Sequence, residues 1–190
     1  MARRARIWFL PVLLCLAAAS TAHAQDSVQH HHPASISSLW PNWPKARPED
    51  VQSVNSVISC YFAVLSGDAK TPRDWNRFKS LFLPDGRLID IKTWYDDPHL
   101  IPAVFDLQRL TEILTVNLRK GDFEEHPVDI QMHVSGSLIQ AIVTSETRIN
   151  VATGVRKARF LYSFELIKDV DRYWIVEVLE QPISGSGRPE

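Results

Sequence analysis

Alternation of apolar and polar residues in the second half of the chain is the feature that most limits its fold. Four runs have this pattern, at residues 128–134, 138–149, 157–167 and 172–181. A period of two residues is typical of β-strands that bury one face. Only short turns separate the runs, at Gly136 and at residues 150–154 and 169–171. We therefore predict four consecutive antiparallel strands.

Three segments ahead of these strands have the apolar spacing of helices. The first carries an apolar stripe formed by Val51, Val54, Val57, Ile58, Tyr61, Val64 and Leu65. Pro48 suits its first turn and Gly67 its end. The second helix is predicted to follow the N-cap Thr71 and to end at Pro84, and the third to span residues 106–119. Helices followed by an antiparallel sheet give an α+β order.

The length of the turn at residues 150–154 predicts which residues share a face of the sheet. The inner face is expected to hold Ala158, Phe160, Tyr162, Phe164 and Leu166, with Ala141, Val143, Ser145 and Thr147 before them and Trp174, Val176 and Val178 after them. Glu146 is then opposite Arg159 on the outer face. A one-residue bulge would reverse this assignment.

The first 24 residues are predicted to be a signal peptide. Three arginines precede an apolar run at residues 7–19, and Ala22-His23-Ala24 has the pattern of a cleavage site. The run is too short for a membrane helix, so we expect export to the periplasm or out of the cell, with no membrane attachment after cleavage. Cleavage removes three arginines and no acid, which changes the net charge from −1 to −4. This charge disfavours nucleic acid as a partner.

Composition divides the mature chain into three parts. Residues 25–48 are rich in Pro, Ser and His, and they are expected to form a linker. Within the linker, Trp40 and Trp43 are large apolar groups that we expect to fold back onto the domain. The domain itself is predicted to span residues 49–182, followed by a flexible tail at residues 183–190.

Several residue strings within residues 49–182 point to a known superfamily. They lie at residues 73–78, 81–82, 85–89, 121–125 and 172–176. They resemble the nuclear-transport-factor-2-like superfamily, which includes ketosteroid isomerase, scytalone dehydratase and SnoaL-like cyclases, and are similar to exported bacterial members of undefined role. The resemblance implies a cone-shaped, curved antiparallel sheet packed on about three N-terminal helices, with an apolar cavity between them. Enzymes and binding modules share this fold, so function needs a site.

Asp90 is the candidate catalytic residue that the resemblance supplies. It ends a short strand predicted at residues 87–91, where ketosteroid isomerase places its general base. An apolar pocket would disfavour its charged form and raise its basicity. The alternative is that Asp90 faces solvent or caps the turn at residues 92–93. Tyr61 lies one residue nearer to Gly67-Asp68 than the isomerase tyrosine lies to its equivalent pair. One residue turns a helix by about 100°, which favours a core tyrosine over an oxyanion donor.

No metal or cofactor site is predicted from the sequence. The cluster at residues 95–99 contains two Asp and one His, but Asp-Asp-Pro is a common turn. The tract His30–His32 could capture a metal, although a linker offers no fixed geometry. Cys60 is the one cysteine of the mature chain, and its apolar neighbours predict a buried, inert thiol. Phosphate-binding and serine-hydrolase motifs are absent.

Three functions remain open at this stage. The first is a binding module for a small apolar or carbonyl-containing molecule, whose pocket is lined by Tyr61, Trp75, Phe78, Phe160, Tyr162 and Trp174. The second is a cofactor-free isomerase, cyclase or dehydratase that uses Asp90 as its base. The third is a homodimeric interaction module, as the resemblance implies, with an outer sheet face that includes Leu161, Tyr173, Ile175 and Leu179.

Overall fold

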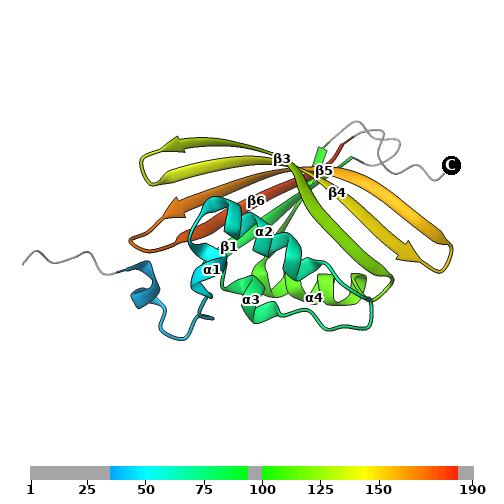
Figure 1. Ribbon diagram of the computed structural model, residues 1–190, viewed down its shortest axis with the longest axis horizontal. Helices are drawn as coiled ribbons and strands as arrows, with labels where there is room; N and C mark the ends of the chain where they lie inside the picture. The colour runs from blue at the N-terminus through cyan, green and yellow to red at the C-terminus, as the bar shows by residue number, and fades with distance from the viewer. Residues whose placement is uncertain (1–34, 94–99, 184–190) are drawn as a thin grey trace, which may run out of the picture. The chain divides into compact units, whose positions relative to one another are not determined.

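The computed structural model describes residues 35–93 and 100–183 (Figure 1). Its elements are η1 (Ile36–Leu39), α1 (Pro48–Val51), α2 (Val54–Leu65), α3 (Trp75–Lys79), β1 (Phe82–Thr93), β2 (Leu100–Asp106), α4 (Leu107–Asn117), β3 (Asp122–Ser135), β4 (Leu138–Val151), β5 (Gly154–Lys168) and β6 (Tyr173–Pro182). The predicted α+β order is confirmed. None of the helices in these two stretches is long and apolar enough to cross a membrane.

The six strands form one sheet in the order β2-β1-β6-β5-β4-β3. All neighbouring strands are antiparallel except β1 and β6, which run parallel, so the sheet is mixed rather than wholly antiparallel. Strand β2 was not predicted from the sequence. It contains Pro102, which interrupts the alternation, and an edge strand is where a sheet tolerates proline.

The helices pack against one face of the sheet, which we call the inner face (Figure 1). Between the two layers lies a group of buried aromatic rings, formed by Tyr61, Phe62, Phe78, Phe82, Tyr162 and Phe164. Tyr61 on α2 and Phe164 on β5 meet edge to face, with their ring centroids 5.1 Å apart. Edge-to-face contact adds to the free energy gained from burying the rings. This aromatic core fixes α2 over the middle of the sheet.

The helix boundaries differ from the predicted ones because of local hydrogen bonds. Ser53 and Ser56 cap each other at the start of α2, so the first predicted helix divides into α1 and α2. The N-cap of α3 is Asp74 rather than Thr71, since its side chain accepts a hydrogen bond from the Arg77 amide at 2.9 Å. The Arg73 guanidinium donates to the carbonyls of residues 65, 67, 68 and 71 and holds the preceding loop out of a helix.

Two bulges decide which side chains of the sheet face inward. The predicted pair Glu146 and Arg159 is confirmed, with an N–O distance of 3.0 Å. A register shift in the β5–β6 pairing then places Ile175 opposite Leu166 and buries it, so the prediction of Ile175 on the outer face is wrong. A second shift lies in β3, between residues 127 and 129. A bulge inserts one unpaired residue, which exchanges inner and outer positions beyond it.

Residues 35–47, ahead of α1, contact the sheet and the loop before β6. The indole of Trp43 donates to the Phe82 carbonyl at 3.0 Å, while Trp40 stays 36% exposed. Asp169 accepts hydrogen bonds from the Ser35 hydroxyl at 2.8 Å and the Ile36 amide at 2.7 Å. These bonds hold the segment against the domain.

Gly121, between α4 and β3, is predicted to tolerate no side chain. A Cβ there would meet the Asn150 carbonyl oxygen in the neighbouring strand and come within 2.9 Å of Val151 Cγ1. We expect Gly121→Ala to lower the free energy of unfolding by about 1–3 kcal/mol, because the backbone must move. Urea unfolding measures this, with Ser137→Ala on an exposed turn as the control. Equal stability of the two variants would contradict the close approach.

Candidate functional site

A cavity of about 240 Å³ lies between the inner face of the sheet and helices α2 and α4. Most of its wall is apolar and includes Leu65, Leu88, Leu110, Leu114, Phe123 and Phe160. Five elements supply these side chains, because α2 and α4 present leucines toward β1, β3 and β5, whose inward residues here are large and apolar. A small-molecule site typically has such a wall with a few polar groups.

Glu125 is the central polar group of this wall. It lies on β3, is 6% exposed, and its carboxylate oxygen Oε1 accepts hydrogen bonds from Ser145 Oγ at 2.6 Å and from the Tyr162 hydroxyl at 2.8 Å. The Ser66 hydroxyl also bonds both backbone groups of Glu125, which holds this part of β3 to the end of α2. The carboxyl group is therefore fixed in position.

Burial raises the pKa of Glu125, although the hydrogen bonds from Ser145 and Tyr162 oppose the shift. The nearby Thr147 hydroxyl also lowers this pKa. Its oxygen Oγ1 is not, however, placed for a full hydrogen bond to any described group. Desolvation is the largest effect, so the protonated form of Glu125 persists to a higher pH than in water. With two donors on Oε1, the proton belongs on Oε2, where it can be donated.

Two tyrosines add hydroxyl groups to the polar part of the cavity wall. Burial raises the pKa of Tyr61 and of Tyr162, so both hydroxyls stay protonated. The Tyr162 hydroxyl donates its hydrogen bond to Glu125, whereas the Tyr61 hydroxyl makes no hydrogen bond within the described residues. The carboxyl groups of Glu180 and Glu125 both act on the pKa of Tyr61, which shows that they lie near it. Tyr61 and Glu125 are thus two donors beside one apolar space.

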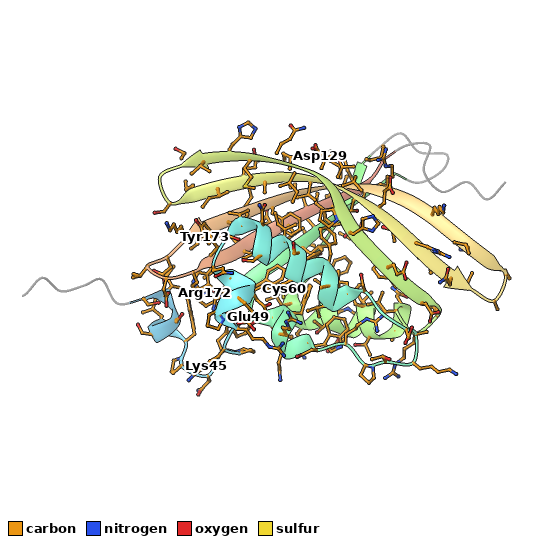
Figure 2. The ribbon with its side chains drawn as sticks, viewed as in Figure 1. Lys45, Glu49, Cys60, Asp129, Arg172 and Tyr173 are labelled. Atoms are coloured by element: carbon orange, nitrogen blue, oxygen red, sulfur yellow. The ribbon has the colours of Figure 1, made fainter. Side chains whose placement is uncertain are left out.

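The structure separates the six predicted pocket residues into two sets. Tyr61, Phe160 and Tyr162 line the cavity. The others do not: Phe78 is fully buried in the aromatic core, and Trp75 borders a different hollow. Trp174 lies away from the cavity because it pairs with Ile167 near the β5–β6 turn, whereas the cavity-lining residue of β6 is Glu180. The Arg172 guanidinium lies 3.4 Å from the centre of the Trp174 ring, and Figure 2 shows Arg172 near α1.

Asp90 is not among the residues that line the cavity. It lies on β1, where it pairs with Ala103 on β2 and with Glu180 on β6, and it shares the inner face with Leu88. Its role as a general base therefore stays a prediction. The cluster at residues 95–99 and the tract at residues 30–32 lie outside the described residues.

Sequence reasoning missed Glu125 because the third strand was predicted to begin at residue 128. The strand begins at Asp122. The bulge after Pro127 shifts the register, so the inward and outward positions before it do not continue the alternation that follows it. Phe123 and Glu125 share one face, so an alternating pattern was present at this point in the sequence. The pattern was not taken for a strand because it contains two adjacent glutamates and a proline, and Glu and Pro are uncommon in strands.

Neither a family model nor a curated protein sequence matches the chain. Solved structures do match. Rv3472, a protein of unknown function from Mycobacterium tuberculosis, is 16% identical with a TM-score of 0.53, over 68% of this chain and 69% of its own. A proposed dehydratase of the nuclear-transport-factor-2-like family from Streptomyces avermitilis is 10% identical, with a TM-score of 0.52, over 70% and 96%.

A proposed calcium/calmodulin-dependent kinase II association domain from Exiguobacterium sibiricum is 11% identical, with a TM-score of 0.53, over 70% of this chain and 92% of its own. Identities this low establish the fold and nothing more. The chain has the nuclear-transport-factor-2-like fold, as the sequence resemblance implied. This fold carries binding modules and enzymes alike, so the function must be argued from the cavity.

Proposed function

We propose that the domain binds a small apolar molecule with one hydrogen-bond acceptor, such as a carbonyl oxygen. The observation that carries this proposal is the buried Glu125 carboxyl group in the wall of an apolar cavity. Such a group loses hydration when buried, and a ligand acceptor that accepts a hydrogen bond from its O–H compensates for that loss. The Tyr61 hydroxyl offers a second donor to the same acceptor or to a neighbouring one.

The size of the cavity limits the ligand. About 240 Å³ lies below the range of roughly 300–1,000 Å³ typical of sites for drug-sized molecules. A ligand with one or two rings fits this volume better than a steroid-sized molecule. The aromatic groups Phe123, Phe160 and Tyr162 suit a flat, apolar body.

Blocking the cavity tests this function. Ala158 lines the cavity, so Ala158→Phe is expected to fill it and to weaken binding of 2-acetylnaphthalene at least tenfold. Isothermal titration measures the dissociation constant. Ala63→Phe, on the exposed side of α2, is the matched control and is expected to bind like the wild type. If 2-acetylnaphthalene does not bind the wild type, or binds both variants equally, the proposed function is wrong.

Catalysis by Asp90 is a second candidate function, as a cofactor-free isomerase, cyclase or dehydratase. It is favoured by one observation: Asp90 lies on the inner face beside Glu180, which lines the cavity. A carbonyl bound by Glu125 would be activated for removal of a neighbouring proton. Asp90→Asn should then stop turnover of a cyclic ketone substrate without changing its affinity; unchanged turnover would exclude Asp90 as the base.

Self-association and export complete the proposal. The outer face of the sheet carries Leu161 and Leu179, both half-buried in the single chain, and a structural neighbour is described as an association domain. We propose that two copies pair through this face, which sedimentation velocity can test. We also propose that the protein is exported to the periplasm or secreted, on the strength of its N-terminal residues 1–24.

A further inference from the structure

We infer that the ligand is an organic anion, with its charged group at the mouth of the cavity against Arg156 and its apolar body inside. This inference rests on the proposed function and adds a substrate class to it. Arg156 lies near the start of β5 and lines the cavity. The alternation of β5 places it on the same side as Ala158 and Phe160, which also line the cavity.

The strand register fixes where Arg156 stands relative to Glu125. Arg156 pairs with Ile149, which pairs with Phe123, whereas Glu125 belongs to the next inward row with Thr147 and Ala158. Rows that share a face are about 7 Å apart along the strands, and β3 and β5 are about 10 Å apart across them. One small ligand can therefore reach from Arg156 to Glu125.

Among the residues that the structure describes, Arg156 has no hydrogen-bond or ion-pair partner. Other arginines of the domain are paired. Arg77 binds Asp50, Arg87 binds Glu177 and Arg159 binds Glu146. A guanidinium at the mouth of an apolar cavity can therefore bind a carboxylate without first breaking another ion pair.

A second cation borders the cavity beside Arg156, because the next residue along β5, Lys157, also contributes to the lining. The nearby acids face away: Asp122 and Glu124 alternate with the inward Phe123, and Asp122 accepts a hydrogen bond from the Ala69 amide at 3.0 Å.

The charges inside the cavity set the direction of the ligand. The interior is lined by apolar side chains and by the Glu125 and Glu180 carboxyl groups, so an anionic group buried there would lose its hydration without gaining a cation as partner. The anionic group therefore belongs at the mouth and the neutral acceptor near Glu125. The chemical class that satisfies both ends is an aromatic or aliphatic carboxylate with a carbonyl group at its far end.

A matched pair of probes tests this inference. The probes are 6-acetyl-2-naphthoate and its uncharged amide, 6-acetyl-2-naphthamide, titrated calorimetrically in low salt. We expect the carboxylate to bind wild-type protein about tenfold more tightly, as one charge-assisted hydrogen bond at a partly exposed site would give. Arg156→Gln should remove this difference. Arg148→Gln is the control. Arg148 lies on the outer face of the same hairpin, and its substitution removes the same charge.

The outcomes separate the two proposals. If the amide and the carboxylate bind equally well, and Arg156→Gln changes neither, the anionic ligand is excluded while the binding function stands. If Arg148→Gln weakens the carboxylate as much as Arg156→Gln does, general attraction by surface charge replaces a defined contact, and the inference is also wrong. If neither probe nor 2-acetylnaphthalene binds, the proposed function itself fails.

Discussion

Wild-type protein should lose affinity for 2-acetylnaphthalene as the pH rises, and Glu125→Gln should remove that loss. Burial raises the pKa of Glu125 above its ordinary value of 4.5, so the donor form persists to a higher pH than in a free carboxyl group and is lost on further titration. An ionised carboxylate cannot donate to a carbonyl. Above this pKa the dissociation constant should rise by up to about tenfold for each pH unit. The glutamine amide donates at every pH and imitates the protonated acid.

Glu125→Gln should also change how the free energy of unfolding depends on pH. A carboxyl group with a raised pKa in the folded state favours folding fully below its unfolded pKa and loses that contribution as the pH rises through the folded pKa. Glu125→Gln has no such loss. The variant should therefore match the wild type at low pH and exceed its free energy of unfolding increasingly above pH 4.5. Urea unfolding across this range measures the difference, and a pH-independent difference would mean that Glu125 is not desolvated.

Asp50→Ala should cause the largest loss of stability outside the cavity. Asp50 is 4% exposed and accepts two hydrogen bonds from the Arg77 guanidinium, at 2.8 Å from Nε and 2.7 Å from Nη2. The pair joins α1 to α3. Removing the carboxylate leaves a half-buried cation without its partner, which costs about 3 kcal/mol and lowers Tm by about 10 °C. Burial, with the Asp50 carboxylate, raises the pKa of the adjacent Cys60 to about 11.

The control for this prediction is an exposed ion pair. Glu146→Ala breaks the pair with Arg159, whose two side chains are about half exposed, and should change stability by less than about 1 kcal/mol. The hydrogen bonds from Arg77 lower the pKa of Asp50 below its ordinary value of 3.8. Its contribution is therefore present above that pH and lost as the pH falls through the lowered value. Equal losses in Asp50→Ala and Glu146→Ala would contradict the role given to the Asp50–Arg77 pair.

The fold was predictable from the sequence where periodicity is unbroken. The apolar stripe of α2 and the alternation through β4 and β5 gave the correct elements, and the pairing of Glu146 with Arg159 followed from one turn length. In these segments, one buried face and a short connection leave a single arrangement that hides the apolar side chains.

The site was less predictable because it depends on breaks in periodicity. A bulge next to Pro127 concealed the start of β3 and with it Glu125, and another in β6 exchanged the places of Trp174 and Ile175. Bulges arise from the packing of a whole sheet, so their positions cannot be predicted from the sequence of any single strand. Arg156 was missed for a different reason: its importance comes from the cavity behind it, whose wall is formed by two helices and several strands that are far apart in the sequence.

The central claim is that the cavity beside Glu125 holds a small apolar ligand. Nuclear Overhauser effects between bound 2-acetylnaphthalene and protein methyl groups test it most directly. The account predicts contacts to the methyl groups of Ala158 and Leu114, which line the cavity from the sheet and from α4. Contacts confined to exposed methyl groups such as those of Met132 and Val134 would place the ligand on the surface and contradict the claim.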